Sequence, residues 1–176
     1  GATIRIVSLL REETAPRRTP TPPTIPSIHR HRPREPQSMR IAITGASGFV
    51  GKALVARLER AHTVVRLVRR DTGPGCARWD PSTGELDLAA LGAIDGVVHL
   101  AGENVAGGRW STARRLAIAN SRGPVTERLC STLAALPTPP RVLVSASATG
   151  IYGDRGDEVL DEQSATGQGF LADVAR

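Results

Sequence analysis

The stretch Arg40-Ile-Ala-Ile-Thr-Gly-Ala-Ser-Gly-Phe-Val-Gly-Lys-Ala-Leu54 decides the fold of the chain. Its apolar residues 41–43 predict a short buried strand, and Gly45, Gly48 and Gly51 follow at three-residue spacing. Apolar side chains then recur every four residues from position 50 to position 58, so a helix is predicted to begin inside the glycine run. A strand, a glycine turn and a helix start together form the context in which such a motif indicates dinucleotide binding.

Each glycine has its own expected role in this loop. Gly45 allows a sharp turn off the strand, Gly48 allows the backbone to approach a pyrophosphate, and Gly51 allows helix and strand to pack closely. The helix N-terminus adds unpaired N–H groups and the positive end of a dipole. The residues predicted to contact the cofactor here are Thr44, Gly45, Ser47, Gly48, Phe49, Val50 and Gly51.

A glycine turn in some other α/β unit is the alternative interpretation of this stretch. A P-loop is excluded, because that motif needs four residues between its glycines, followed by Lys and Ser or Thr. Here five residues separate Gly45 from Gly51, and Ala53 stands where a hydroxyl is required. The dinucleotide site is favoured because the following residues continue to alternate between strand and helix patterns.

A second strand is predicted over 63–68, a β-branched and apolar run that ends in Arg69-Arg70. At about 20 residues past the glycines, an NAD-binding fold places an acidic residue on the ribose 2′-OH. Two arginines suit a 2′-phosphate instead, through bidentate contacts. The pair therefore predicts NADP(H) as the cofactor, with plain surface arginines as the alternative. Asp71 keeps NAD in consideration.

Further strand and helix patterns follow along the chain. We predict strands over 76–80, 94–102 and 141–146, a turn at 81–84 and a helical turn over 86–91. Ser111 is the expected N-cap of a longer helix, bent at Gly123-Pro124. The apolar stripe of that helix consists of Leu116, Val125, Leu129, Leu133 and Leu136. Residues 154–168 predict a surface loop, and residues 170–176 predict the first turns of another helix.

These elements predict an α/β fold, a Rossmann-type doubly wound parallel sheet over residues 39–176 that is incomplete at its C-terminus. In such a sheet the ligand lies outside the carboxyl ends of the strands. We therefore expect Leu100, Ala101 and Gly102 to face the cofactor. His99, just before them, is interpreted as a strand residue rather than a catalyst, because no acidic or nucleophilic partner pattern accompanies it.

Residues 1–38 form a leader of different composition. The chain carries a net charge of +6, and the leader, with seven Arg and three Glu, accounts for +4 of it. We therefore expect no nucleic-acid partner for the rest of the chain. The leader also holds seven of the thirteen prolines, a density that prevents helix and sheet and predicts disorder.

Three explanations of the leader remain open. It could be a targeting peptide, although Glu12 and Glu13 fit that class poorly. It could be a basic tail for nucleic acid. It could also be upstream sequence translated ahead of a natural start at Met39, which is the explanation we favour.

Cysteine usage and hydropathy predict the compartment. Cys76 and Cys130 match neither a metal-ligand nor a redox-pair pattern, which favours a reduced, cytoplasmic chain without a metal site. No apolar run approaches the length of a membrane span, so no membrane partner is expected. A small-molecule substrate is expected, of a class that the sequence leaves open.

Three motifs resemble those of the extended short-chain dehydrogenase/reductases. The segment Thr44-Gly-Ala-Ser-Gly-Phe-Val-Gly51 is similar to their cofactor loop, and Val98-His-Leu-Ala-Gly102 is similar to their fourth-strand motif. Ser145-Ala-Ser-Ala-Thr-Gly-Ile-Tyr-Gly153 resembles their fifth-strand serine motif, with one extra residue before the Tyr-Gly pair.

The chain is more similar still to one branch, the "epimerase family" proteins, which are sugar-nucleotide-epimerase-like and carry a C-terminal domain of unknown function. The motifs that carry this resemblance are Leu100-Ala-Gly-Glu-Asn104, Arg109-Trp110, Ser121-Arg122, Ser147-Ala-Thr-Gly150 with Tyr152-Gly-Asp154, and Phe170-Leu-Ala172. The resemblance covers Met39 to Arg176. Because members of the branch are considerably longer, the chain is expected to be an N-terminal fragment without the last strands and the C-terminal substrate region.

The resemblance implies hydride transfer that uses a Tyr acid/base, a Lys in a Tyr-x-x-x-Lys pair and a Ser that orients the substrate. Ser147 matches the serine position. Where the pair is expected, the chain reads Phe170-Leu-Ala-Asp-Val174, which supplies neither a phenol nor an amine. The only Tyr is Tyr152 and the only Lys is Lys52. The named branch shares this departure.

Two classes of function therefore stay open. The first is an NADP(H)-binding oxidoreductase or epimerase-like enzyme with Ser147 and Tyr152 as its candidate catalytic residues. Tyr152 would act as the acid/base with Arg109, Arg122 or Asp154 nearby, although packing of Tyr152 against the serine loop is the interpretation we favour. Arg109 and Arg122 would hold an anionic substrate or the cofactor, with a surface or loop-anchoring role as the alternative. The second is a non-catalytic NADP(H)-binding regulatory or scaffold protein, which the residues at 170–174 favour.

Overall fold

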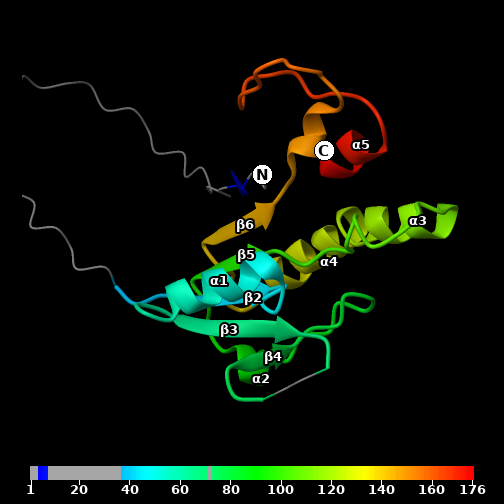
Figure 1. The fold of residues 1–176 in the computed structure, drawn as a ribbon. Helices are drawn as coiled ribbons and strands as arrows, with labels where there is room; N and C mark the ends of the chain where they lie inside the picture. Colours follow the sequence, from blue (N-terminus) through cyan, green and yellow to red (C-terminus); the bar gives the residue numbers. More distant parts are fainter. Residues whose placement is uncertain (1–3, 8–36, 71–72) are drawn as a thin grey trace, which may run out of the picture.

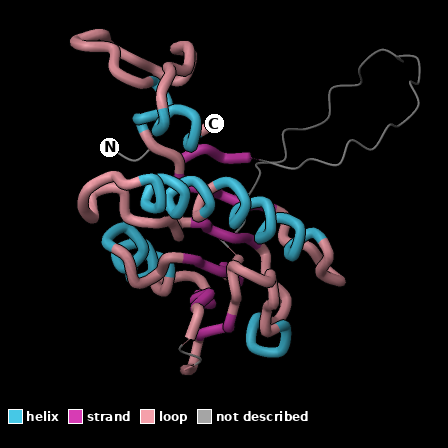
Figure 2. Tube along the Cα trace, turned by 90° about the vertical axis from the view of Figure 1, so that its right-hand side faces the viewer, coloured by secondary structure: helices cyan, strands magenta, loops and turns pink. Residues whose placement is uncertain are grey.

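A six-stranded sheet runs through the middle of the molecule, with helices on both of its faces (Figure 1, Figure 2). The computed structural model describes residues 4–7, 37–70 and 73–176. Five strands are parallel, and their spatial order is β4 (Cys76–Arg78), β3 (Thr63–Val68), β2 (Arg40–Thr44), β5 (Gly96–His99) and β6 (Val142–Ala146). The predicted Rossmann-type, doubly wound parallel sheet is therefore confirmed.

Strand β2 lies at the point where the strand order reverses. It pairs with β3 on one side and with β5 on the other, and Thr44 lies opposite both Leu67 and His99. The carboxyl ends of these three strands are therefore level at one edge of the sheet. This is the topological switch point at which open α/β sheets bind their ligands.

The sixth strand, β1 (Ile4–Val7), pairs antiparallel with the outer edge of β6. These four residues depart from the expectation of a disordered leader over residues 1–38. Their Ile-Arg-Ile-Val sequence is rich in β-branched residues, and the prolines begin only at Pro16. Residues 1–3 and 8–36 of the predicted disordered segment lie outside the described residues.

One face of the sheet is covered by α1 (Phe49–Leu58). Ile41, Ile43 and Val64 of the strands pack there with Val55 of the helix. The buried strand predicted at 41–43 is thus confirmed, and the helix begins inside the glycine run as predicted. It ends at Leu58.

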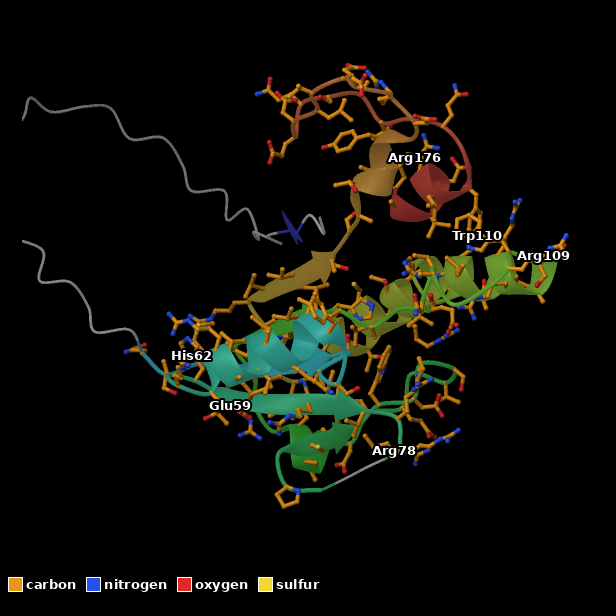
Figure 3. The ribbon with its side chains drawn as sticks, in the orientation of Figure 1. Glu59, His62, Arg78, Arg109, Trp110 and Arg176 are labelled. Atoms are coloured by element: carbon orange, nitrogen blue, oxygen red, sulfur yellow. The ribbon has the colours of Figure 1, made fainter. Side chains whose placement is uncertain are left out.

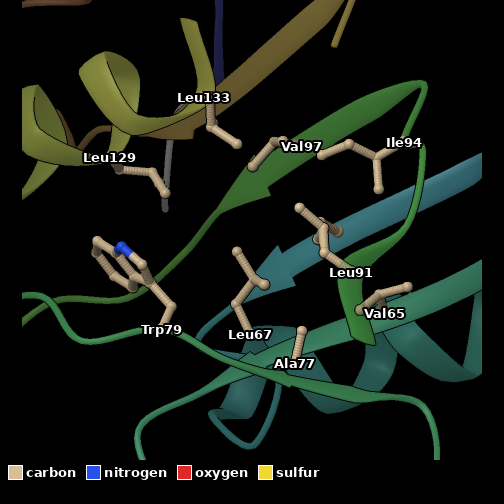
Figure 4. Packing of buried hydrophobic residues seen from close by; sticks show 10 residues of the cluster. Val65, Leu67, Ala77, Trp79, Leu91, Ile94, Val97, Leu129 and Leu133 are labelled. Carbon is tan, nitrogen blue, oxygen red and sulfur yellow. The ribbon is translucent and has the colours of Figure 1, made fainter. Parts of the chain in front are cut away.

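The opposite face is covered by α2 (Leu88–Leu91) and α4 (Gly123–Ala134). Because successive residues of a strand point to opposite faces, Val65 packs on this side although Val64 packs against α1. Figure 4 shows the packing of this larger cluster, which includes Leu67, Ala77, Trp79, Leu91, Val97, Leu129 and Leu133.

The long bent helix predicted after Ser111 is two helices in the structure. Helix α3 (Thr112–Asn120) is capped as predicted, because the Ser111 hydroxyl accepts the Arg114 N–H at 3.2 Å. The chain then breaks at residues 121–122, and Pro124 lies in the first turn of α4, where its missing N–H costs nothing. The two helices differ in phase, so Leu116 is 61% exposed and Ile118 is buried instead.

Beyond β6 the chain forms a 3₁₀ helix, η1 (Thr149–Tyr152), then the predicted surface loop and α5 (Phe170–Ala175). Helix α5 packs against η1, next to the carboxyl end of β6 (Figure 1). Within the part of the chain that the structure describes, no helix has the length and apolar character needed to cross a membrane.

We predict that Leu129→Ala lowers the free energy of unfolding by about 3 kcal/mol, because it leaves a cavity in the fully buried cluster beside Trp79 and Leu133. Urea unfolding measures the effect. The matched control is Leu116→Ala on α3, whose exposed side chain should change stability by less than about 0.5 kcal/mol. Equal losses from the two variants would contradict the packing of α4.

Candidate functional site

Gly45 turns the chain off β2 in a backbone conformation that favours glycine. Its φ is +68°, and a Cβ atom at this position would lie 2.8–2.9 Å from the backbone atoms of Leu100 and Ala101. Any side chain would therefore be strained and would also push apart the ends of β2 and β5. The turn predicted here is confirmed, and it places the predicted cofactor-facing segment 100–102 beside the glycine loop.

Gly51 and Gly48 bring the start of α1 onto this turn. A Cβ atom on Gly51 would lie 2.2 Å from the Gly45 carbonyl oxygen, so only glycine allows the helix to approach so closely. Gly48 precedes the helix, and its N–H donates to the same oxygen at 3.0 Å. The N-cap residue, Gly48, has no side chain with which to cap this ten-residue helix, so the N–H groups of the first turn are available to an anion.

The remaining predicted loop residues lie around this helix start. Ser47 is exposed, as are Phe49 and Val50 in the first turn of α1, with exposed fractions of 97% for Phe49 and 50% for Val50. These side chains leave the backbone of the glycine loop open to a ligand. The fit of the loop to a pyrophosphate thus depends on main-chain atoms rather than on side chains.

The buried hydroxyl of Thr44 ties the ends of β2 and β5 together. It accepts the N–H groups of Leu100 and Ala101, both at 3.1 Å, and lies 2.7 Å from Nδ1 of His99. A hydroxyl has one hydrogen and two lone pairs. Because two N–H donors occupy the lone pairs, the Thr44 hydrogen must be donated to His99.

This count fixes the tautomer of His99. Nδ1 accepts from Thr44, so Nε2 carries the proton and donates to the Thr126 hydroxyl at 3.1 Å. The Trp79 ring meets the imidazole edge-on, with ring centroids 6.4 Å apart. Burial lowers the pKa of His99 to about 4, so the ring is neutral near pH 7. His99 is a positioning residue of the strand, in agreement with the interpretation of the sequence.

Arg69 and Arg70 follow directly after β3, and both are exposed. The register of β2 and β3 places Thr44 opposite Leu67, so the two arginines lie beyond the level at which Gly45 leaves the sheet. They flank the glycine loop on the side away from β5. Their position suits a phosphate on the adenosine half of a dinucleotide.

The structure brings together two motifs that are 20 residues apart in the sequence. The Ser121 hydroxyl accepts the N–H of Glu103 at 2.9 Å and donates to the Ile118 carbonyl at 2.8 Å. Arg122 places its guanidinium against Gly102, where a Cβ atom would lie 3.2 Å from Cζ. The segment after β5 is therefore held by the junction between α3 and α4.

The candidate catalytic residues lie in the segment that follows β6. The Ser147 hydroxyl donates to the Ala175 carbonyl of α5 at 3.5 Å. Tyr152 lies in η1 and lines a cavity of about 370 Å³ together with Thr149, Asp154, Arg155, Leu160, Asp161 and Glu162. Asp154 is thus near Tyr152 as expected, whereas Arg122 contacts Gly102 and Arg109 is exposed near Trp110 (Figure 3).

Phe170, at the position expected for an acid/base Tyr, is a packing residue. Its ring meets Trp110 with centroids 5.6 Å apart, and the Arg115 guanidinium carbon lies 5.7 Å from the ring centroid. The Trp110 Nε1–H donates to the Val105 carbonyl at 2.9 Å. Phe170 therefore fastens α5 to the loop before α3.

Sequence reasoning missed two of these arrangements, the Thr44–His99–Thr126 chain and the seat of Arg122 on Gly102. Both join residues from different elements. The Leu100-Ala-Gly and Ser121-Arg122 motifs each carry part of the family resemblance, but their spacing in the sequence does not indicate that they are in contact.

The fold and the glycine loop define a Rossmann-type domain with a dinucleotide-binding loop. Residues 41–171 match the NAD dependent epimerase/dehydratase family. The chain belongs to this family, and the resemblance to extended short-chain dehydrogenase/reductases is confirmed.

Relatives in the epimerase-family branch include proteins from bacteria and animals. Epimerase family protein Mb2239 of Mycobacterium bovis is 43% identical over 136 residues, which cover 76% of this chain and 44% of the relative. Human epimerase family protein SDR39U1 is 33% identical over 131 residues, which cover 73% of this chain and 43% of the relative. The chain therefore spans less than half the length of these relatives.

Solved structures that are similar to this chain include one human and one bacterial protein. The crystal structure of human SDR39U1 isoform 2 with NADPH has a TM-score of 0.66 at 32% identity and covers 77% of this chain and 46% of that chain. The nucleoside-diphosphate sugar epimerase of Corynebacterium glutamicum has a TM-score of 0.63 at 38% identity and covers 78% of this chain and 29% of that chain.

We predict that His99 makes the free energy of unfolding depend on pH. Its pKa is about 4 when folded and near 6.5 when unfolded, so the unfolded chain takes up the proton first as the pH falls. The contribution is complete above pH 6.5, and about 3 kcal/mol is lost as the pH falls to 4.

Urea unfolding between pH 4 and pH 7 measures this slope in the wild type and in His99→Gln. The variant should lose that part of the slope, whereas His62→Gln, at a half-exposed histidine, should keep it. A slope that His99→Gln leaves unchanged would contradict the buried neutral ring.

Proposed function

We propose that the chain forms the NADP(H)-binding part of an oxidoreductase or epimerase-like enzyme. The observation that carries the proposal is the loop from Gly45 to Gly51. A Cβ atom on Gly45 or Gly51 would clash with backbone atoms, and the loop leads into the N-terminus of α1, which has no side-chain cap. This geometry fits a pyrophosphate, which needs close main-chain approach and N–H donors.

The preference for NADP(H) is supported by Arg69 and Arg70 at the end of β3. Guanidinium groups bind phosphate through charge-assisted, often bidentate hydrogen bonds. The structure of human SDR39U1, which is 32% identical, holds NADPH. A structure of MoeE5, which is 27% identical, holds NAD and UDP-glucose, so NAD stays the alternative cofactor.

NADPH supplies a hydride to a carbonyl carbon when it is bound. The residues of this chain would orient the substrate and move the proton. Ser147, just after β6, would hold the substrate oxygen, and Tyr152 of η1 would donate the proton. The similarity to a nucleoside-diphosphate sugar epimerase favours sugar nucleotides as the first substrates to test.

A non-catalytic NADP(H)-binding regulatory or scaffold protein is the second candidate. Its support is the packing of Phe170 between Trp110 and Arg115, together with Val174 at the expected Lys position. In this candidate, α5 packs against Trp110 and Arg115 and takes no part in proton transfer. For both candidates we expect a small-molecule ligand and no nucleic-acid or membrane partner, and a cytoplasmic location stays a prediction.

We predict that Arg69→Ala and Arg70→Ala each weaken NADPH binding about tenfold and leave NADH binding unchanged, because each removes charge-assisted hydrogen bonds to the 2′-phosphate. Isothermal titration with both cofactors measures the effect. Arg57→Ala, at an exposed arginine in the last turn of α1, is the control. Equal affinities for NADPH and NADH, unaltered by the two variants, would refute the role of the arginines.

We predict that Ser147→Ala and Tyr152→Phe each lower the rate of NADPH oxidation about 100-fold, because substrate orientation and proton donation are lost. The assay uses carbonyl compounds and nucleoside-diphosphate sugars, with Ser131→Ala on the exposed part of α4 as the control. If the wild type binds NADPH but oxidises it with no compound, the scaffold candidate is favoured. Rates unchanged in both variants would contradict the catalytic assignment.

A further inference from the structure

Arg122 is a half-buried cation at the carboxyl end of β5. It lies at the junction between α3 and α4, with Cζ, Nη2 and Nη1 at 3.2, 3.3 and 3.4 Å from the position of a Cβ atom on Gly102. These near-equal distances mean that the plane of the guanidinium faces Gly102. The group fits there because residue 102 has no side chain.

Only one nitrogen of this guanidinium has a partner among the residues that the structure describes. Nη1 donates to the Ser121 hydroxyl at 3.1 Å and to the Ile118 carbonyl at 3.4 Å. Nε and Nη2, which carry three N–H groups between them, have no acceptor in the described part of the chain. The fixed end of the group is therefore Nη1, and the other donors remain for a ligand.

No carboxylate neutralises Arg122 within the described ranges. Burial lowers its pKa, and the charge of Glu103 opposes that effect. The Glu103 carboxylate is, however, paired with Arg114 at 2.8 Å. Because Glu103 is paired with Arg114, the positive charge of Arg122 has no paired carboxylate of its own, and a partly buried charge of this kind is costly unless an anion approaches.

The place of Arg122 differs from that of the other arginines near the crevice. Arg69 and Arg70 follow β3, on the side of β2 away from β5. Arg122 belongs to the connection between β5 and β6, in the other half of the sheet. A ligand that crosses the switch point from the glycine loop toward β6 would pass the exposed Gly102 and meet this guanidinium.

We propose that Arg122 binds a phosphate group in the half of the crevice between β5 and β6, with Ser121 and Gly102 holding its guanidinium in place. The placement of a dinucleotide on the glycine loop rests on the proposed function. The phosphate is either the nicotinamide-side phosphate of the cofactor or a group of a second, phosphate-bearing ligand.

The test measures binding to the full chain in three settings: NADPH, 2′,5′-ADP, and inorganic pyrophosphate added to the NADPH-loaded protein. Arg122→Gln removes the charge, and Arg122→Lys keeps a point charge without the flat fork. The control is Arg141→Gln, which makes the same charge change at an exposed ion pair with Asp95 near the start of β6.

If the cofactor supplies the phosphate, Arg122→Gln weakens NADPH binding at least tenfold and leaves 2′,5′-ADP binding unchanged, because that fragment lacks the nicotinamide side. If a second ligand supplies it, NADPH binding is kept and pyrophosphate binding to the loaded protein is lost. In either setting Arg122→Lys gives an intermediate loss. The proposal is overturned if Arg122→Gln matches Arg141→Gln throughout.

Two further results separate this proposal from the proposed function. If the wild type binds neither NADPH nor 2′,5′-ADP, the cofactor assignment fails, and pyrophosphate is added to the protein alone. A rise in melting temperature in the wild type and in Arg141→Gln, but not in Arg122→Gln, then supports the phosphate site, and equal rises overturn it.

If Arg122→Gln does not fold, Gly102→Ala replaces it, since its Cβ atom displaces the guanidinium. It should cause a smaller loss in the same setting, and no loss overturns the proposal.

Discussion

The close approach of Gly45 to the backbone of Leu100 and Ala101 is the constraint on which the rest of the site depends. It brings the ends of β2 and β5 so near that one hydroxyl, that of Thr44, can accept two N–H groups from the neighbouring strand. The same turn lets α1 pack closely, with Gly51 against the backbone of Gly45 and Ala46. A side chain at position 45 would separate these strand ends. The glycine loop, the start of α1 and the segment 100–102 would then no longer lie side by side.

The sequence predicted the parts of the fold that depend on local patterns. Each of these patterns lies within a few consecutive residues, and the structure confirms each of them: the apolar run at 41–43, the β-branched run at 63–68 and the helix cap at Ser111. The glycine loop was predictable for the same reason. Its turn and its close packing both follow from glycines at fixed spacing after a strand.

The features that escaped prediction depend on register and phase between distant segments. Thr44 and His99 are 55 residues apart, and they meet only because β2 and β5 pair with these residues opposite each other. The break between α3 and α4 shifted the phase of the apolar stripe, which exposed Leu116 and buried Ile118. The contact of Arg122 with Gly102 depends on both the break between α3 and α4 and the pairing of β2 with β5. No local sequence pattern therefore predicts it.

The cofactor loop and residue 170, where the family resemblance implies an acid/base Tyr, lie on different elements. Cofactor binding and proton transfer therefore depend on separate parts of the chain. The loop depends on contacts among β2, α1 and β5, whereas residue 170 lies on α5 and contacts Trp110 and Arg115. A change at residue 170 therefore alters how α5 docks without moving Gly45 or Thr44. For this reason an intact glycine loop supports cofactor binding, and it carries no information about proton transfer, for which Ser147 and Tyr152 are only the proposed side chains.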